Sequence, residues 1–183
     1  MLSKPRQLDS ESSLYDAAIR ILMRRAHSVH EMKQALERRC GDASLVRNVL
    51  ARLKSAGLID DARYAKQFAR HRTESRNQGK FRIARDLRAR GVADRHIEAA
   101  IEEAAQQTDE ATLVRQRIER KLRSLRGPAA GNAGAGKVID DKKRASLYRS
   151  LLRSGFSADV VLRELRSMTR EDVSEGGAET EAE

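Results

Sequence analysis

Apolar residues recur along this chain at the three- and four-residue spacing that marks one face of an α-helix. Leu14, Ala17, Ala18, Ile21 and Leu22 show this spacing clearly. No segment alternates apolar and polar residues as a half-buried strand does, and aromatic residues make up only 3% of the chain. The sequence therefore predicts an all-α fold with nine helices. Their apolar stripes lie at residues 14–22, 32–36, 45–53, 65–69, 83–87, 97–104, 114–125, 147–152 and 161–168.

Glycines separate many of these stripes. Gly41, Gly57, Gly79, Gly91 and Gly155 each lie between two segments of helical spacing. Glycine is the residue preferred just after a helix ends, because it adopts left-handed backbone angles at little cost. We therefore expect a helix C-cap at each of the five positions.

Two of these boundaries lie in similar segments, which indicates an internal repeat. Arg-Asp-Leu-Arg-Ala-Arg-Gly-Val at 85–92 matches Arg-Ser-Leu-Leu-Arg-Ser-Gly-Phe at 149–156, so that Leu87 corresponds to Leu151, and Leu36 takes the same place nearer the N-terminus. Leu36 and Leu87 are 51 residues apart, whereas Leu87 and Leu151 are 64 residues apart. A Gly/Ala-rich stretch between Leu87 and Leu151 explains why the second spacing is longer. The pattern predicts three tandem units of three helices each, with a period of about 50 residues.

The domain boundaries follow from the repeat and from composition. We expect the first two repeats at 12–57 and 58–106, and the third at 107–169, interrupted by a flexible Gly/Ala linker at 127–138. Disordered segments are expected at both ends, residues 1–11 and an acidic tail at 170–183.

Charge narrows the class of partner. The chain carries a formal net charge of +10, but six acidic residues and no Lys or Arg follow residue 170, so residues 1–170 carry +16. A body this basic favours a polyanion, most commonly nucleic acid. Because aromatic residues are few, we expect contacts to the phosphate backbone without base stacking or sequence reading. The basic residues expected to contact phosphate or an acidic protein surface are Arg72, Arg76, Lys80, Arg82, Arg85, Arg88, Arg115, Arg120, Lys121 and Arg123.

Candidate catalytic groups have simpler structural interpretations. His27, His30 and Glu31 could suggest a metal site, but Ser28-x-x-Glu31 is a capping box, which places His27 before the helix. Asp60 and Asp61 precede a helix in the same manner and are expected to cap it. Cys40 is the single cysteine, so one chain cannot form a disulfide. We expect no catalytic residue, no metal site and no cofactor.

Three ordered motifs resemble the RecX family of regulatory proteins. Residues 28–36, Ser-Val-His-Glu-Met-Lys-Gln-Ala-Leu, resemble the family's Ser-x-x-Glu-Leu-x-x-x-Leu signature. Residues 57–68, from Gly-Leu-Ile-Asp-Asp-Ala-Arg-Tyr-Ala to Phe, are similar to its Gly-Tyr-Leu-Asp-Asp-x-Arg-Phe-Ala segment. Residues 79–91, Gly-Lys-Phe-Arg-Ile-Ala-Arg-Asp-Leu-Arg-Ala-Arg-Gly, resemble its Lys-Gly-x-x-Arg-Ile-x-x-x-Leu-x-x-x-Gly segment. The resemblance extends from about Leu14 to Met168.

The resemblance implies tandem three-helix repeats in an elongated, curved molecule. It also implies binding to RecA filaments on single-stranded DNA, with inhibition of RecA's ATPase and strand exchange in recombination and DNA repair. The family has no fixed catalytic motif, so the ten basic residues named above rest on charge alone. The Gly/Ala linker and the acidic tail both depart from the family pattern.

Other functions remain as alternatives. Three-helix units can contain a helix-turn-helix, so a sequence-specific transcription factor is the main one, although no dimerisation helix is evident. A Mg²⁺-dependent nuclease using Asp60 and Asp61 is a second. The first nine residues lack the apolar run of a signal peptide, and no stretch approaches the ~20 apolar residues of a membrane span. We expect a monomeric cytoplasmic protein that does not contact membranes.

Overall fold

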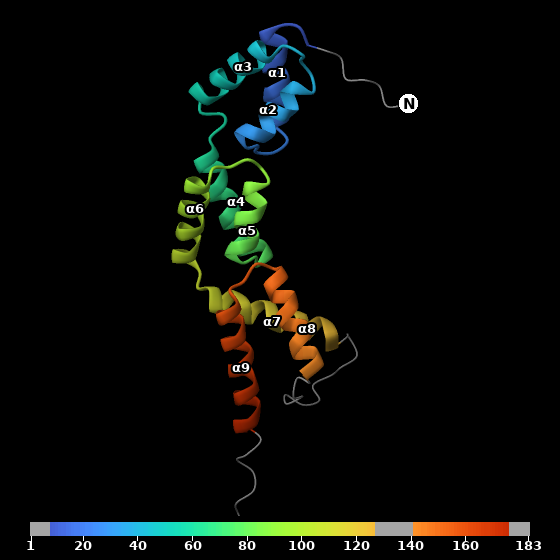
Figure 1. The fold of residues 1–183 in the computed structure, drawn as a ribbon, viewed down its shortest axis with the longest axis vertical. Helices are drawn as coiled ribbons and strands as arrows, with labels where there is room; N and C mark the ends of the chain where they lie inside the picture. The colour runs from blue at the N-terminus through green and yellow to red at the C-terminus, as the bar shows by residue number, and fades with distance from the viewer. Residues whose placement is uncertain (1–7, 127–140, 176–183) are drawn as a thin grey trace, which may run out of the picture. The chain divides into compact units, whose positions relative to one another are not determined.

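The structure is a computed structural model that describes residues 8–126 and 141–175, with side chains described for residues 8–124 and 141–167. The described residues form nine α-helices and no β-strand (Figure 1), which confirms the predicted all-α fold. The helices are α1 (Glu11–Leu22), α2 (Val29–Glu37), α3 (Ala43–Ser55), α4 (Asp61–Arg76), α5 (Lys80–Arg88), α6 (Asp94–Gln107), α7 (Glu110–Arg126), α8 (Asp141–Arg153) and α9 (Ala158–Glu175).

The chain divides into two compact units. The first consists of Met1–Arg70 and Ala84–Glu103, and the second of His71–Ile83 and Ala104–Glu183. Each unit therefore draws on part of α4 and part of α5, and these compact units do not coincide with the predicted repeats. The repeat boundaries stay a prediction. The 127–138 linker lies outside the described residues.

The first unit contains a core formed by α1, α2 and α3, which pack against one another. Leu14, Met32, Leu36, Val49 and Leu53 are completely buried there, as their helical spacing predicts. Leu8 packs partly buried against this core, and its N–H donates to the carbonyl of Arg39 at 2.8 Å. Order therefore extends into residues 8–11, part of the segment predicted to be disordered.

The start of α2 confirms the predicted capping box. Ser28 Oγ accepts from the Glu31 N–H, and the Glu31 carboxylate accepts from the Ser28 N–H. Arg25 donates to the same carboxylate at 3.1 Å. Burial raises the pKa of Glu31, but the hydrogen bonds from Arg25 and the Ser28 amide outweigh that effect and leave the pKa below its ordinary value. Ser28 Oγ also donates to the carbonyl of Arg90 at 2.6 Å.

At the start of α4, the predicted capping role is confirmed for Asp60 but not for Asp61. Asp60 Oδ1 accepts from the N–H groups of Ala62 and Arg63 at 2.8 and 3.1 Å. The hydrogen bond from the Arg63 amide is the main reason why the pKa of Asp60 lies below its ordinary value. Asp61 Oδ1 instead accepts from the N–H of Val29 at 2.9 Å, which ties the start of α4 to the start of α2.

The second unit contains a core formed by α7, α8 and α9. Helix α9 packs against both α7 and α8, and α7 packs against α8 (Figure 1). Val114, Ile118, Leu151, Phe156 and Val161 are buried between them. Helix α9 continues to Glu175, so the start of the predicted acidic tail is helical, and the rest of the tail lies outside the described residues. After Gly155 the sequence contains no glycine until positions 176 and 177. The absence of a helix-ending glycine explains the length of α9.

Three of the five expected glycine caps are present. Gly57, Gly91 and Gly155 have φ values of +65°, +70° and +89°, and each is followed by a residue whose N–H bonds back to a carbonyl five residues earlier. Leu36, Leu87 and Leu151, the predicted equivalents, are all buried. Gly41 and Gly79 lack the left-handed conformation. At the end of α4 that conformation falls on Asn77 instead, with φ +44°.

Candidate nucleic-acid interface

The ten predicted contact residues lie on three helices. Arg72 and Arg76 are on the last part of α4, and four others are on α7. Lys80 and Arg82 lie at the start of α5. These two residues, like the predicted residues of α4 and α7, belong to the second compact unit. Arg85 and Arg88 lie further along α5, in the part that belongs to the first unit. The α7 residues are Arg115, Arg120, Lys121 and Arg123.

Asn77 brings the end of α4 against α7. Its side chain is almost fully buried, and Nδ2 donates to Gln116 Oε1 at 2.9 Å. Arg120 Nη2 donates to Asn77 Oδ1 at 3.3 Å, and Arg117 Nη1 donates to the carbonyl of Arg76 at 2.8 Å. The tertiary structure thus places Arg76, Arg117 and Arg120 around one buried amide. We call Arg76, Arg117 and Arg120, together with the exposed Arg123 one turn further along α7, the α4–α7 arginine cluster.

The electrostatics of the α4–α7 arginine cluster suit an anion. Burial lowers the pKa of the Arg117 guanidinium, and the positive charge of Arg120, three residues later on the same helix, lowers it further. The oxygens that accept from these two guanidinium groups belong to backbone carbonyls and an amide. Such acceptors orient the arginines without neutralising them. An incoming phosphate would relieve their repulsion and receive charge-assisted hydrogen bonds.

Two of the predicted α7 residues make internal contacts. Arg115 pairs with Glu164 of α9, whose side chain is only 4% exposed. Lys121 Nζ donates to Ser150 Oγ of α8 at 2.7 Å. Arg115 and Lys121 therefore help to hold α9 and α8 against α7. Charge alone could not separate them from the outward-facing cations of the same helix.

The predicted residues of α5 also have partners. Lys80 Nζ lies 3.4 Å from Glu110 Oε2, and Arg82 Nη1 donates to the carbonyl of Arg153 at 3.5 Å. Arg88 Nε pairs with Asp94 at 2.6 Å, whereas Arg85 is only 4.0 Å from its neighbour Asp86. All these arginine and lysine side chains are at least partly exposed, so these contacts leave room for further ligands.

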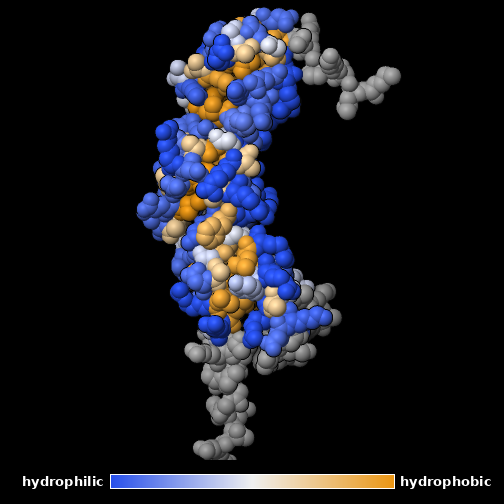
Figure 2. Space-filling view, viewed as in Figure 1, coloured by the Kyte–Doolittle hydropathy of each residue, from blue (hydrophilic) through white to orange (hydrophobic). Residues whose placement is uncertain are grey.

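Sequence reasoning missed two residues in this part of the chain. Arg117 was visible as one cation in the basic run of α7, but only its contact with Arg76 distinguishes it from its neighbours. Because aromatic residues are few, the sequence predicted no base stacking and did not single out Phe81, yet 61% of its surface is exposed. On the face drawn in Figure 2, hydrophobic residues reach the surface in patches bordered by hydrophilic ones. Among the residues whose side chains the structure describes, the exposed large apolar ones are Met23, Leu58, Phe81, Leu152 and Leu162.

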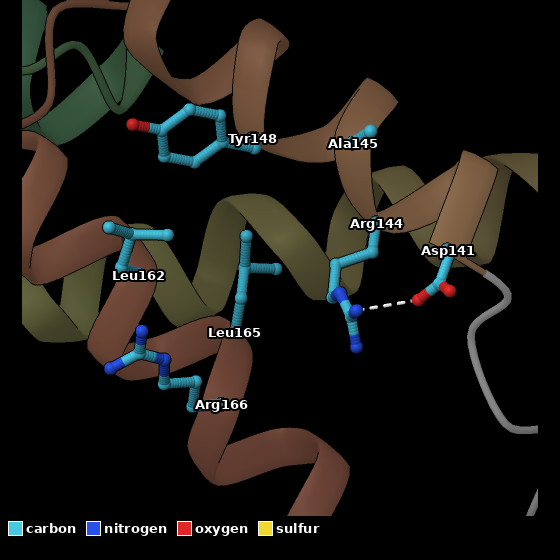
Figure 3. Close-up of a pocket in the computed structure, with 7 residues that line it drawn as sticks. All are labelled: Asp141, Arg144, Ala145, Tyr148, Leu162, Leu165 and Arg166. Atoms are coloured by element: carbon cyan, nitrogen blue, oxygen red, sulfur yellow. Dashed lines mark hydrogen bonds and ion pairs between the residues drawn. The ribbon is translucent and has the colours of Figure 1, made fainter.

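A pocket of about 590 Å³ lies between α8 and α9 (Figure 3). Tyr148, Leu162 and Leu165 point toward its space, and the Asp141–Arg144 ion pair lies at one end. None of the ten predicted contact residues lines it. The pocket therefore contributes nothing to the candidate interface.

Among the described residues, no three His, Cys, Asp or Glu side chains gather in a way that could hold a metal ion. No described helix is both long enough and apolar enough to cross a membrane.

Sequence comparison now assigns the chain to a family. Residues 15–53 match the family model of the first RecX three-helix domain, and residues 60–101 match that of the second. The Regulatory protein RecX of Halorhodospira halophila is 38% identical over 152 residues, which cover 83% of this chain and 86% of that protein. The chain belongs to the RecX family. This confirms the resemblance seen in the sequence motifs. A Regulatory protein RecX from Streptomyces coelicolor is 28% identical over 89% of this chain and 79% of its own.

Solved RecX structures share the fold. The crystal structure of RecX from Lactobacillus salivarius aligns with a TM-score of 0.65 at 20% identity, covering 86% of this chain and 96% of that one. A second crystal structure of regulatory protein RecX aligns with a TM-score of 0.66 at 20% identity, covering 88% and 71%. At this identity the likeness supports the helical fold and carries no residue assignments.

Proposed function

We propose that this protein binds RecA filaments on single-stranded DNA and inhibits RecA's ATPase and strand exchange in recombination and DNA repair. Membership of the RecX family of regulatory proteins supports this proposal. The observation that carries the DNA contact is the α4–α7 arginine cluster, where guanidinium groups are oriented by neutral acceptors. We propose a monomer that catalyses no reaction and works in the cytoplasm beside its DNA.

The chemistry of the cluster supports contact with phosphate. Guanidinium groups present paired donors that match phosphate oxygens, and such contacts position a protein on nucleic acid without reading bases. The family resemblance adds RecA as the protein that coats the strand. A regulator that holds phosphate and RecA together would block the addition or retention of RecA subunits.

Inhibition of RecA's DNA-dependent ATPase tests the proposal. The wild-type protein should lower the rate of ATP hydrolysis by RecA on single-stranded DNA at or below one molecule per RecA subunit. The double variant R76E/R123E should need at least about ten times more protein for the same inhibition, because each reversal replaces attraction to phosphate with repulsion. R38E/R47E, two exposed reversals outside the ten predicted positions, is the matched control.

The outcomes separate the two parts of the proposal. No inhibition by folded wild-type protein at any ratio would overturn the RecA assignment. Equal inhibition by R76E/R123E and R38E/R47E would show that the α4–α7 arginine cluster is the wrong surface. Circular dichroism checks that both variants retain their helices.

Competition between DNA substrates tests the alternative of a transcription factor. Strong preference for one duplex sequence over an excess of unrelated DNA would favour a helix-turn-helix regulator. We expect no such preference, because the cluster presents donors suited to phosphate and has no base-specific arrangement of its own.

A further inference from the structure

Phe81 is unusually exposed for an aromatic residue, because the next apolar residues of the same helix, Ile83 and Ala84, are both buried. It lies one residue into α5, where Ile83 is 2% exposed, whereas Phe81 itself is 61% exposed. An exposed phenyl ring is unfavourable in water, and such a ring among charged groups is a recurrent feature of binding surfaces.

The backbone beneath Phe81 is held by a close contact between two glycine junctions. The N–H of Phe81 donates to the carbonyl of Gly155 at 3.1 Å, and the N–H of Gly79 donates to that of Ser154 at 2.9 Å. A Cβ added at Gly79 would lie 2.2 Å from the Gly155 oxygen, and one added at Gly155 would lie 2.2 Å from the Arg82 nitrogen. The segments at Gly79 and Gly155 pack so closely that the backbone at Phe81 is held in one position. A rigid platform loses little conformational entropy when it binds.

The surroundings of the ring are cationic. Lys80 Nζ lies 5.4 Å from the ring centroid, close enough for a cation–π contact. Lys80 is also 3.4 Å from Glu110, which accepts from Ser157 N–H at 2.8 Å, so the ammonium group is held in place. Arg82 follows on the other side of Phe81 in the chain, half-buried. One aromatic ring with an ordered ammonium group near it, and a second cation next to it in the chain, matches a base with its flanking phosphates.

We propose that Phe81 stacks against an unpaired base of single-stranded DNA while Lys80 and Arg82 contact the adjoining phosphates. Base-on-aromatic stacking tolerates any sequence, because every base has a flat face. It also favours single strands, since a duplex hides its bases inside the stack. Charge complementarity selects this occupant over an apolar protein surface or a lipid tail, neither of which uses the cations. The inference deepens the proposed function and rests on its DNA contact, but needs no RecA.

A tryptophan at position 81 reports the contact directly. The natural chain contains no tryptophan, so F81W is the sole indole in the protein. Titration with an oligothymidylate should quench its fluorescence, and an oligomer of the same length with abasic sites throughout should not. L58W is the matched control, because Leu58 is 42% exposed but lies beside Asp60 and Asp61. Its fluorescence should respond to neither oligomer.

Affinity measurements separate stacking from charge. F81A should bind the oligothymidylate about tenfold more weakly, with an unchanged slope of log Kd against log salt concentration. F81Y should restore the affinity. K80A should instead flatten the slope, because one fewer counterion is released. A structural role for Phe81 would lower the melting temperature of F81A and would not produce this split.

The experiment uses naked oligonucleotides, so its result is independent of RecA inhibition. Wild-type affinity in F81A, or equal quenching of F81W by abasic and normal oligomers, would overturn the stacking proposal even if RecA is inhibited. Loss of RecA inhibition in F81A with unchanged affinity for the naked strand would also overturn it, and would assign Phe81 to a protein contact. Quenching of F81W by the normal oligomer alone would support stacking even if RecA proved not to be the partner.

Discussion

Glycines have two different structural roles in this protein. Gly57 provides a left-handed turn in open space, where nothing lies within 4 Å of an added Cβ. Gly155 provides the same kind of turn and also allows a close approach, because a Cβ there would meet the backbone of Arg82. The cost of replacing each glycine should therefore differ in kind as well as in size.

Alanine substitution at these two glycines tests the distinction. G57A should lower the free energy of unfolding by about 1 kcal/mol, the cost of a left-handed alanine. G155A adds a steric clash to that strain and should lower it by about 3 kcal/mol. Urea unfolding followed by circular dichroism measures both. Equal losses for the two variants would show that the second junction can relax around a methyl group.

The basic residues of helix α7 have two different roles. Arg115 and Lys121 bond to side chains of α9 and α8, whereas Arg120 bonds to Asn77 at the end of α4 and Arg123 is exposed. Residues 115–126 include six basic residues and a single acidic one, Glu119. A helix with so many basic residues is usually interpreted as a single binding surface. Here Arg115 and Lys121 instead stabilise the packing of α7 against α9 and α8.

Removal of Arg115 should destabilise this core through its buried partner. R115M leaves the Glu164 carboxylate buried without its guanidinium and should lower the free energy of unfolding by about 3 kcal/mol. R115M/E164M should recover most of that loss, because neither charge then remains buried. R123A, on the exposed side of the same helix, should change it by less than about 0.5 kcal/mol. Urea denaturation of the four proteins provides the comparison, and equal stability of R115M and R123A would contradict the packing role.

At the scale of the whole molecule, charge is distributed unevenly along the chain. The +16 of residues 1–170 far exceeds the net +10, and the acidic end accounts for the difference. Affinity for single-stranded DNA should therefore depend strongly on salt, because each phosphate contact releases counterions.

Salt titration measures how many cations contact the strand. The four residues of the α4–α7 arginine cluster alone would give a slope of log affinity against log salt near −2.8, so that a rise from about 50 to 200 mM salt would weaken binding roughly 50-fold. R76A/R123A should reduce the slope by about 1.4, whereas R38A/R47A should leave it unchanged. Fluorescence anisotropy of a labelled oligonucleotide gives these slopes. An unaltered slope in R76A/R123A would place the DNA elsewhere on the protein.

Features that depend on neighbours in the chain could be predicted from the sequence. The apolar spacing of Leu14, Ala17 and Ala18, the capping box at Ser28 and the cap at Asp60 are all local patterns. The sequence motifs also led to the correct family. The prediction failed at Gly79, because its role comes from contact with Gly155, 76 residues later, and not from its own backbone angles.

By itself, the sequence determined the helices, most of their caps and the family, because hydrogen bonds within a helix and at its ends join residues only a few positions apart. Only the tertiary structure decided how each cation is used. Arg115 and Arg120 look alike in the chain, yet one meets a buried carboxylate on α9 and the other a buried amide at the end of α4. Phe81 likewise became a candidate contact only once the fold had left its ring in solvent. Residues distant in the sequence decide how far each charged side chain is buried and which electrostatic potential surrounds it. These two properties distinguish a charge that stabilises the fold from a charge that can bind a ligand.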